Sequence, residues 1–307
     1  MTKYVAKRLL YMIPVLLGVA FLVFSILSLT PGDPGSIILG ITASKEDIAA
    51  LNAEFGYDKP FLIRFFNYIG DIVFHFNLGV SYQSRQPVIQ DIVARFPNTL
   101  LLTVFSMSLS ALIGILLGIV SAVRQYSVLD HTCVIVALVF ASIPGFWLGL
   151  MLMLIFCVIL KWLPITAEVS FVGMILPSLT LSARSLATIA RMTRSSMLEV
   201  MSQDYILTAK AQGFNSRKII FSHALKNAMN SIVTVAGIQF GTLLGGSVIT
   251  EKVYGWPGLG ELVITAIKAR DFPVVQTTIL VIAVSFVAVN LFVDVLYVLI
   301  NPRIKYV

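Results

Sequence analysis

Charged residues are scarce in this chain, since Asp, Glu, Lys and Arg make up only 12% of its 307 residues. A soluble domain carries about 25%, whereas 58% of the residues here are hydrophobic and the mean hydropathy is +0.92. With half the expected charge, lipid must replace water over much of the surface. The composition excludes a soluble globular protein, a disordered chain and a coiled coil.

Cysteine is also rare, because Cys133 and Cys157 are the only two. They lie in one apolar run, and their separation is about 36 Å if that run is a single helix. Two thiols at that distance cannot form a disulfide. We therefore expect both to be packing residues, and a disulfide scaffold is excluded.

Residues that would support catalysis are missing as well. His75, His131 and His223 are far apart, and no metal-ligating cluster or catalytic triad is visible. No Gly-Lys pair occurs, which excludes a phosphate-binding P-loop, so any use of ATP must come from a partner. An intramembrane hydrolase would need a Ser/His or Asp/Asp pair inside the apolar spans, and no such pair is visible. A stand-alone secondary transporter would show an inverted repeat and intramembrane carboxylates, and only Asp294, near the end of the last apolar run, comes near that pattern.

Six apolar segments are long enough to cross about 30 Å of hydrocarbon. Five of them carry no charge, namely 9–30, 99–123, 132–160, 228–250 and 272–293. The sixth, 171–192, contains Pro177 and Arg184 but is otherwise apolar or small. The first segment is too long for a signal-peptide core and no cleavage site follows it, so it stays attached. The sequence predicts an all-α membrane protein with six transmembrane helices.

Basic residues in the short loops indicate the orientation of these spans. With the amino terminus in the cytoplasm, the short inner segments hold twelve Lys and Arg and the short outer loops hold four. The inner set is Lys3, Lys7, Arg8, Arg124, Arg191, Arg194, Lys210, Arg217, Lys218, Lys226, Arg303 and Lys305, and the outer set is Lys161, Lys252, Lys268 and Arg270. Both termini are therefore predicted to be cytoplasmic.

The long outer segment 31–98 carries its own helix signals. Ser44-Lys45-Glu46-Asp47 resembles a capping box and Gly56 is a natural helix stop. The stretch 60–76 interleaves Phe, Ile and Tyr with few charges, which suits a helix at the membrane interface or one packed on its neighbours, and we favour packing. The predicted domains are 1–30 (tail and first span), 31–98 (helical extracytoplasmic segment) and 99–307 (core).

Two features inside the spans allow both a structural and a functional interpretation. Glycines four residues apart permit close helix packing, and for the series from Gly237 to Gly246 the alternative is that small side chains line a moving interface between two subunits. The glycines four apart are Gly114, Gly118, Gly145, Gly149, Gly237, Gly241 and Gly245.

Arg184 lies about 16 Å below Gly173 in a helix, near the midplane, where a charge costs at least about 2.5 kcal/mol. It either pairs with a carbonyl or a polar residue such as Gln239, or it is a cation in a translocation path that meets a substrate carboxylate. The hypothetical path comprises Arg184, Gln239, Gly241 and Gly245.

The most informative segment, 204–228, connects the fourth and fifth spans of the sequence. Asp204 is a plausible N-cap, a helix with small residues follows, and Gly213 fits the left-handed position after its end. Ser216 can cap a second helix that leads into the next span. Two short helices around a glycine form a knob that suits a groove on another protein.

At this segment the sequence resembles the conserved cytoplasmic loop of binding-protein-dependent ABC importer permeases. The matching residues are Thr208-Ala209-Lys210-Ala211-Gln212-Gly213 and His223-Ala224-Leu225-Lys226-Asn227-Ala228. The family consensus has Glu-Ala-Ala and a later Leu-Pro, and these departures resemble the first permease subunit of the dipeptide, oligopeptide, glutathione and nickel systems. Further matching stretches cover most of the chain: 31–34, 76–81, 191–197, 256–260, 270–273, and 294 with 301–303.

The resemblance implies a type I ABC importer permease fold and a permease function in the bacterial inner membrane. It implies as partners a second homologous permease, two ATPase subunits that bind ATP and Mg, and an external solute-binding protein. The implied cargo is a di- or oligopeptide, including glutathione-like peptides, with nickel or a metal chelate as the alternative. The implied ATPase-coupling residues are Asp204, Tyr205, Thr208, Ala209, Lys210, Ala211, Gln212 and Gly213.

Overall fold

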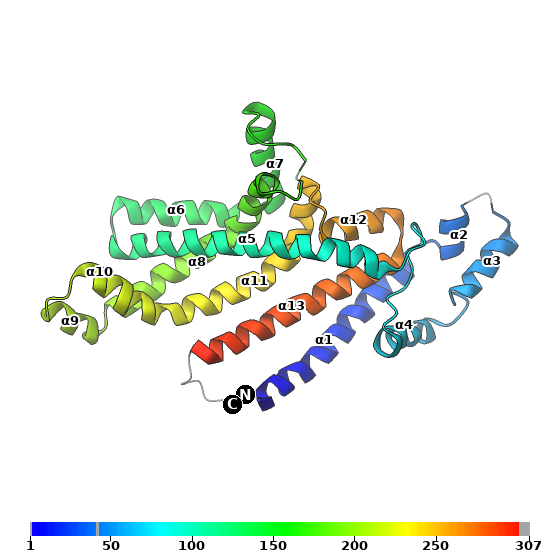
Figure 1. Ribbon diagram of the computed structural model, residues 1–307, viewed down its shortest axis with the longest axis horizontal. Coiled ribbons are helices and arrows are strands. Elements are labelled where there is room, and N and C mark those ends of the chain that lie inside the picture. Colours follow the sequence, from blue (N-terminus) through cyan, green and yellow to red (C-terminus); the bar gives the residue numbers. More distant parts are fainter. Residues whose placement is uncertain (1, 41–42, 167, 301–307) are drawn as a thin grey trace. The chain divides into compact units, whose positions relative to one another are not determined.

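The computed structural model describes residues 2–40, 43–166 and 168–300, and within these ranges the chain is helical, with only an isolated bridge between Val80 and Pro87 (Figure 1). Arg303 and Lys305 lie outside the described residues, as does the side chain of Asp294. The helices are α1 (Thr2–Leu29), α2 (Pro34–Leu39), α3 (Lys45–Glu54), α4 (Phe61–His75), α5 (Val88–Val123), α6 (Val128–Ser142), α7 (Gly145–Met153), η1 (Leu154–Ile159), α8 (Phe171–Met201), α9 (Asp204–Ala211), α10 (Ser216–Lys218), η2 (Ile219–Leu225), α11 (Lys226–Tyr254), α12 (Leu259–Ala269) and α13 (Phe272–Ile300).

Two compact units divide the chain. One comprises Met1–Pro97 and Pro257–Ser285, and the other comprises Asn98–Trp256 and Phe286–Val307. Both are therefore built from segments that are far apart in the sequence. The division into 1–30, 31–98 and 99–307 stays a prediction.

Five helices in the described ranges are long and apolar enough to span a membrane, and a bent pair of helices makes a sixth candidate. Five of the six predicted spans are thus present as single helices, whereas the continuous helix expected over 132–160 is wrong. The chain bends by 101° between Val128–Ser142 and Gly145–Ile159. Pro144 lacks the N–H that would continue α6, and it forces Ile143 into an extended conformation (ψ 128°). Cys133 and Cys157 consequently lie on different helices, and both are free.

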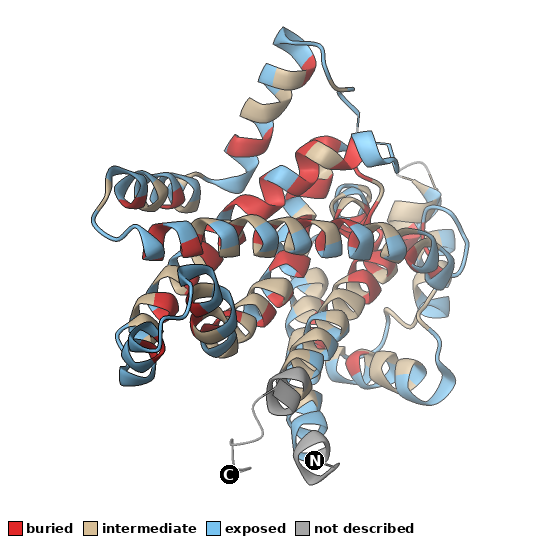
Figure 2. Cartoon of the chain, turned by 60° about the vertical axis from the view of Figure 1, so that its left-hand side comes forward, coloured by how far each residue is buried: buried red, intermediate tan, exposed pale blue. Residues whose placement is uncertain are grey.

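Helix α8 is the most buried of the candidate spans (Figure 2). It packs against α6, α7 and α11 in the second unit. Gly114 and Gly118 of α5 let that helix approach α8, because an added Cβ would lie 2.9 Å from the Leu186 carbonyl oxygen and 2.7 Å from that of Ala190. The packing interpretation of the glycine pattern is therefore confirmed for these two positions, whereas Gly145 has open space around it.

In the first unit the helical segment after α1 follows the sequence signals closely. Ser44 accepts a hydrogen bond from the Asp47 N–H at the start of α3, and Gly56 has a φ of +69° just beyond its end. Asp33 caps α2, and the Asn52 amide donates to its carboxylate at 2.7 Å, which ties α2 to α3. Asp271 accepts hydrogen bonds from the Ser81 hydroxyl and the Tyr82 N–H. The polar residues of this unit thus hold loops in place.

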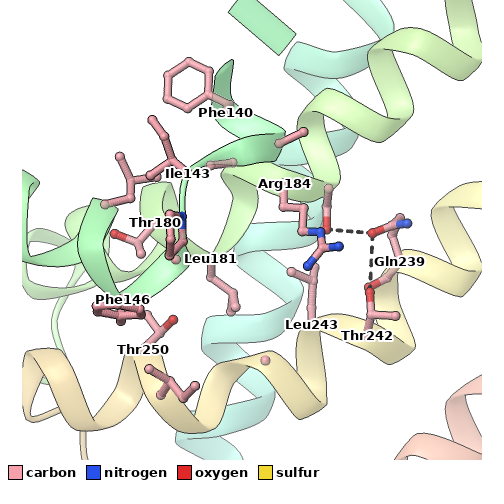
Figure 3. A pocket seen from close by; sticks show the side chains of 18 of the residues that line it. Phe140, Ile143, Phe146, Thr180, Leu181, Arg184, Gln239, Thr242, Leu243 and Thr250 are labelled. Atoms are coloured by element: carbon pink, nitrogen blue, oxygen red, sulfur yellow. Dashed lines mark hydrogen bonds between the residues drawn. The ribbon is translucent and has the colours of Figure 1, made fainter. Parts of the chain in front are cut away.

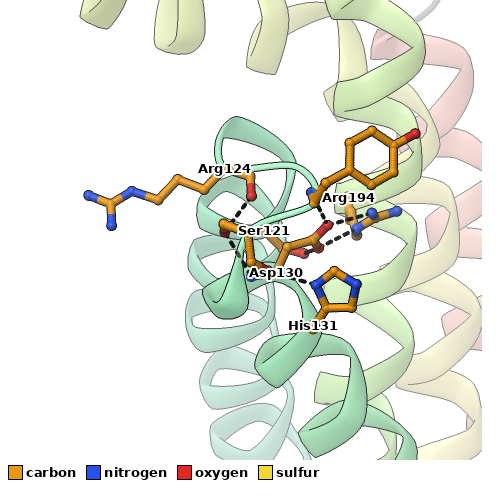
Figure 4. A network of polar contacts seen from close by, with 7 residues as sticks. Ser121, Arg124, Asp130, His131 and Arg194 are labelled. Atoms are coloured by element: carbon orange, nitrogen blue, oxygen red, sulfur yellow. Dashed lines mark hydrogen bonds and ion pairs between the residues drawn. The ribbon is translucent and has the colours of Figure 1, made fainter.

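A buried ion pair fastens α6 to α8 in the second unit (Figure 4). Arg194 donates from Nε and from a terminal guanidinium nitrogen to the two oxygens of Asp130, at 2.7 and 2.8 Å. Asp130 also accepts from the Ser121 hydroxyl and the Tyr126 N–H. The Asp130 side chain is 4% exposed and that of Arg194 is 27% exposed. The arrangement satisfies a carboxylate that would otherwise be isolated at the base of two apolar helices.

We predict that Arg194→Ala lowers the free energy of unfolding by about 3 kcal/mol, because it leaves the buried Asp130 without its counter-charge. Arg194→Lys should lose less, since an ammonium reaches the carboxylate but cannot bind both oxygens in a fork. Arg191→Ala on the same helix is the matched control, because Arg191 is exposed. Thermal unfolding in detergent measures all three. Equal loss of stability in Arg191→Ala and Arg194→Ala would contradict the assignment.

Candidate functional site

The first candidate site is the loop around α9, which connects α8 to α11. Helix α9 covers Asp204–Ala211, and a second helix begins at Ser216 and continues through α10 and the π-helical η2 into α11. The predicted pair of helices is confirmed. The predicted caps are wrong by one residue at both helices, because Gln203 and Asn215 occupy the N-cap positions. Only Asn215 caps through its side chain, which accepts from the Arg217 N–H at 3.1 Å.

The turn between these helices depends on Gly213. Its φ is +79°, as the sequence predicts for this glycine. The Gly213 N–H bonds to the Lys210 carbonyl at 3.0 Å, and the Phe214 N–H bonds to the Ala209 carbonyl at 3.2 Å. Phe214 then stacks on His223, with ring centroids 5.6 Å apart. The loop is therefore a defined turn.

One face of α9 is buried against η2, and the other face is exposed. Ile206 is fully buried and Ala209 is 5% exposed, and both belong to a hydrophobic cluster with Ile219 and Ala224 of η2. Ala209 therefore packs inward in this chain. The remaining residues that the resemblance implies for coupling are exposed: Asp204, Tyr205, Thr208, Lys210, Ala211, Gln212 and Gly213.

The second candidate site is a cavity of about 590 Å³ between the bend after α6, helix α8 and helix α11 (Figure 3). Aromatic and aliphatic side chains such as Phe140, Phe146 and Leu243 share its lining with Thr180, Thr242 and Thr250. Arg184 is the one ionisable side chain among the described residues that line it. Such a mixture of apolar walls and a few polar groups is typical of small-molecule sites.

Arg184 and Gln239, both predicted from the sequence, line this cavity together. They do not pair with each other: the Gln239 side-chain oxygen accepts from the Ser185 hydroxyl at 3.2 Å and from the Thr242 hydroxyl at 3.4 Å. Within the described residues the Arg184 guanidinium has no hydrogen-bond or ion-pair partner. The proposed structural pairing with Gln239 is thus absent here.

The other two residues of the hypothetical path lie elsewhere. Gly241 is buried, with Phe286 and Asn290 of α13 closest to its position, and Gly245 has open space around it. Their neighbour Gly246 lines the cavity. Residues 140–146 form a further wall of the cavity that the apolar pattern does not predict, although Pro144 is a signal that the helix breaks there.

Comparison with known proteins decides the family. Residues 114–306 match the family model "Binding-protein-dependent transport system inner membrane component", and residues 1–103 match the model of its N-terminal region. The chain belongs to this permease family. It is a transport component of an ABC importer and not the catalytic subunit, and its resemblance to the peptide and glutathione branch is confirmed.

Named relatives match this permease over its whole length. It is 44% identical over 306 residues to the glutathione transport system permease protein GsiC of Salmonella choleraesuis, and 43% identical to GsiC of Escherichia coli K12, with 100% of each chain covered.

Among solved structures, the MetNI methionine ABC transporter in an inward-facing conformation is similar in fold, with a TM-score of 0.60 and 21% identity over 70% of this chain and 98% of that one. An amino acid ABC transporter crystallised with histidines has a TM-score of 0.52 and 18% identity over 70% and 95% of the two chains. The predicted ABC importer permease fold is confirmed.

Proposed function

We propose that this permease subunit imports di- and oligopeptides, including glutathione-like peptides, in an ATP-driven importer that depends on a binding protein. The observation that carries the proposal is the Arg184 guanidinium, which faces the cavity without a partner among the described residues. The names of the full-length relatives support the same cargo. Arg184 is the cation that a peptide carboxylate would meet.

The chemistry of the cavity fits a peptide. A guanidinium binds a carboxylate through two parallel N–H···O bonds, and the hydroxyls of Thr180, Thr242 and Thr250 suit the amide groups of a peptide backbone. Phe140 and Phe146 offer apolar surface to side chains. A cation held in an apolar span is costly, and binding of an anion relieves part of that cost.

A bare metal ion fits the cavity poorly. The described residues hold no group of three or more His, Cys, Asp or Glu that could bind a metal. Divalent transition metals prefer imidazole, thiolate or carboxylate ligands, and Arg184 would repel a cation. A nickel chelate that carries carboxylates remains the alternative cargo.

The position of α9 supports its role as the coupling helix. It follows directly after α8, which carries Arg184, and it precedes the continuous helix that becomes α11, which carries Gln239. A rotation of α9 would therefore move two walls of the cavity together. We propose that the exposed face of α9 lies in a groove of an ATPase subunit, so that closure of the ATPase dimer switches the cavity between the two sides of the membrane.

The complete importer in this proposal contains this permease, a second homologous permease, two ATPase subunits and an extracytoplasmic binding protein. The ATPase subunits bind ATP and Mg. The complex lies in the bacterial inner membrane with both termini of this chain in the cytoplasm, and the basic residues of the short loops support that orientation.

We predict that Arg184→Gln weakens peptide uptake by about 10-fold to 100-fold in KM, because it removes a charge-assisted hydrogen bond of about 1.5–3 kcal/mol. Arg184→Lys should retain part of the affinity, since it keeps the charge but not the fork. Uptake of labelled glutathione or a dipeptide into proteoliposomes, with saturating binding protein, gives KM and the maximal rate. A carboxyl-amidated dipeptide should lose affinity for the wild type but not for Arg184→Gln. Unchanged KM in Arg184→Gln with normal assembly would remove Arg184 from the path.

We predict that Gly213→Val uncouples ATP hydrolysis from uptake or prevents assembly with the ATPase. A β-branched residue is strained at a φ of +79°, and an added Cβ meets nothing within 4 Å in this chain, so no internal clash confuses the result. Gly213→Asn is the matched control, because Asn tolerates the left-handed conformation. Substrate-stimulated ATPase activity of the reconstituted importer is the measurement. Coupling like that of the wild type in Gly213→Val would refute the role of this turn.

We predict that glutathione or a dipeptide is taken up by the complete importer in an ATP-dependent manner, whereas free Ni²⁺ is not, because the cavity carries a cation and no metal ligands. Parallel uptake of radioactive nickel and labelled peptide, each with the binding protein, distinguishes the two cargoes. Uptake of nickel only when an organic chelator is added would favour the metal-chelate alternative.

A further inference from the structure

Helix α4 has more apolar surface than the rest of its unit covers. At about 100° per residue, its side chains fall on three faces. The first packs on α1 and holds Phe61, Phe65, Tyr68 and Ile69. The second is polar and holds Arg64, Asn67, Asp71 and His75. The third holds Leu62, Ile63, Phe66, Val73 and Phe74, and all five are exposed.

The first face fixes where α4 lies along α1. The Phe65 ring packs edge-on against Phe21 and Phe24 of α1, with centroids 5.2 and 5.5 Å apart. Phe61 makes similar contacts with the same two rings, at 5.9 and 5.4 Å. Phe24 also stacks on Tyr68 at 5.7 Å, so helix α4 is attached to α1 through five aromatic contacts at one level.

That level lies within the hydrocarbon-spanning part of α1. The apolar span of α1 ends at Leu29, and at 1.5 Å per residue Phe24 and Phe21 lie about 8 and 12 Å before that end. Leu22 and Ile26 of α1 are exposed at the same level, on the side of this apolar span that the other described residues leave uncovered. Interfacial helices bury their apolar face about 5–10 Å into the boundary of headgroups and acyl chains, which matches the depth of α4.

The polar face of α4 carries Arg64, whose guanidinium lies over the Tyr57 ring, 3.6 Å from its centroid, and 5.7 Å from the centroid of Phe24. His75 and Asp71 lie 3.5 Å apart and are both largely exposed. The charged groups of α4 thus gather opposite Phe66 and Val73, which are 67% and 55% exposed. One side of the helix suits water and the other does not.

We propose that the third face of α4 is embedded in phospholipid, in the leaflet at the Leu29 end of α1. Helix α4 is then an interfacial membrane helix that is attached to α1 on one side and immersed in lipid on another. A soluble protein would not reach this face at the depth of Phe21 and Phe24. The packing favoured for the segment 60–76 is confirmed by the contacts of α4 with α1, and the proposal adds the interfacial position that the sequence left as the alternative.

The depth of spin labels tests the proposal. Single cysteines replace Phe66 or Val73 on the apolar face and Asn67 or Asp71 on the polar face, in a Cys133→Ser, Cys157→Ala background. The full chain, with its partner subunits, is placed in nanodiscs of phosphatidylethanolamine and phosphatidylglycerol. Collision rates of each label are measured with O₂, which concentrates in lipid, and with a water-soluble nickel chelate. Leu22→Cys on α1 serves as the lipid reference.

We expect the ratio of O₂ to nickel-chelate collisions to be several-fold higher at positions 66 and 73 than at positions 67 and 71, and close to that at position 22. Equally low ratios on both faces would place α4 in water and overturn the proposal. Low accessibility to both reagents at positions 66 and 73 would overturn it too, because protein would then cover this face. Two positions on each face keep the test decisive if one variant does not assemble.

Discussion

The constraint on which this structure depends is the cost of a charge away from bulk water, either buried in protein or inside an apolar span. Helix α8 carries two arginines that meet this cost in opposite ways. Arg194 binds both oxygens of Asp130, and the Ser121 hydroxyl and the Tyr126 N–H complete the set of donors to that carboxylate. Arg184, ten residues earlier, faces a cavity and has no such partner among the described residues. The first arrangement fixes two helices to each other, whereas the second leaves a cation available to a ligand.

The sequence predicts the spans well because each depends on local composition. Five of the apolar spans, the Ser44 cap and the left-handed Gly213 are predicted from a few consecutive residues, and the structure has all of them. Contacts between distant segments are different. Nothing in the sequence pairs Asp130 with Arg194, 64 residues away, and the inward orientation of Ala209 depends on Ile219 and Ala224 of another helix.

The bend after α6 lies between these two cases, because a local signal for it exists but the hydropathy pattern does not contain that signal. The absence of charge over 132–160 favoured one continuous helix, yet Pro144 breaks it, since hydropathy does not sense a missing N–H donor. The consequence extends beyond that helix, because residues 140–146 form a wall of the cavity. For Arg184 and Gln239 the cost of burying polar groups was a sound guide. It could not predict Gly241 or Gly245, because glycines serve helix packing as readily as they serve a pathway.

A cavity with a single cation also bears on how a permease transports its cargo. A site that holds a ligand tightly slows its release, so conduction requires binding that is favourable enough to enter and weak enough to leave. One guanidinium and a few hydroxyls provide orientation and modest affinity, and they do not discriminate strongly between peptides that share a carboxylate. Strong selection among such peptides would need a site that pairs more of their polar groups. In the proposed importer that task belongs to the binding protein, and the role of Arg184 is to orient the cargo during the change of access.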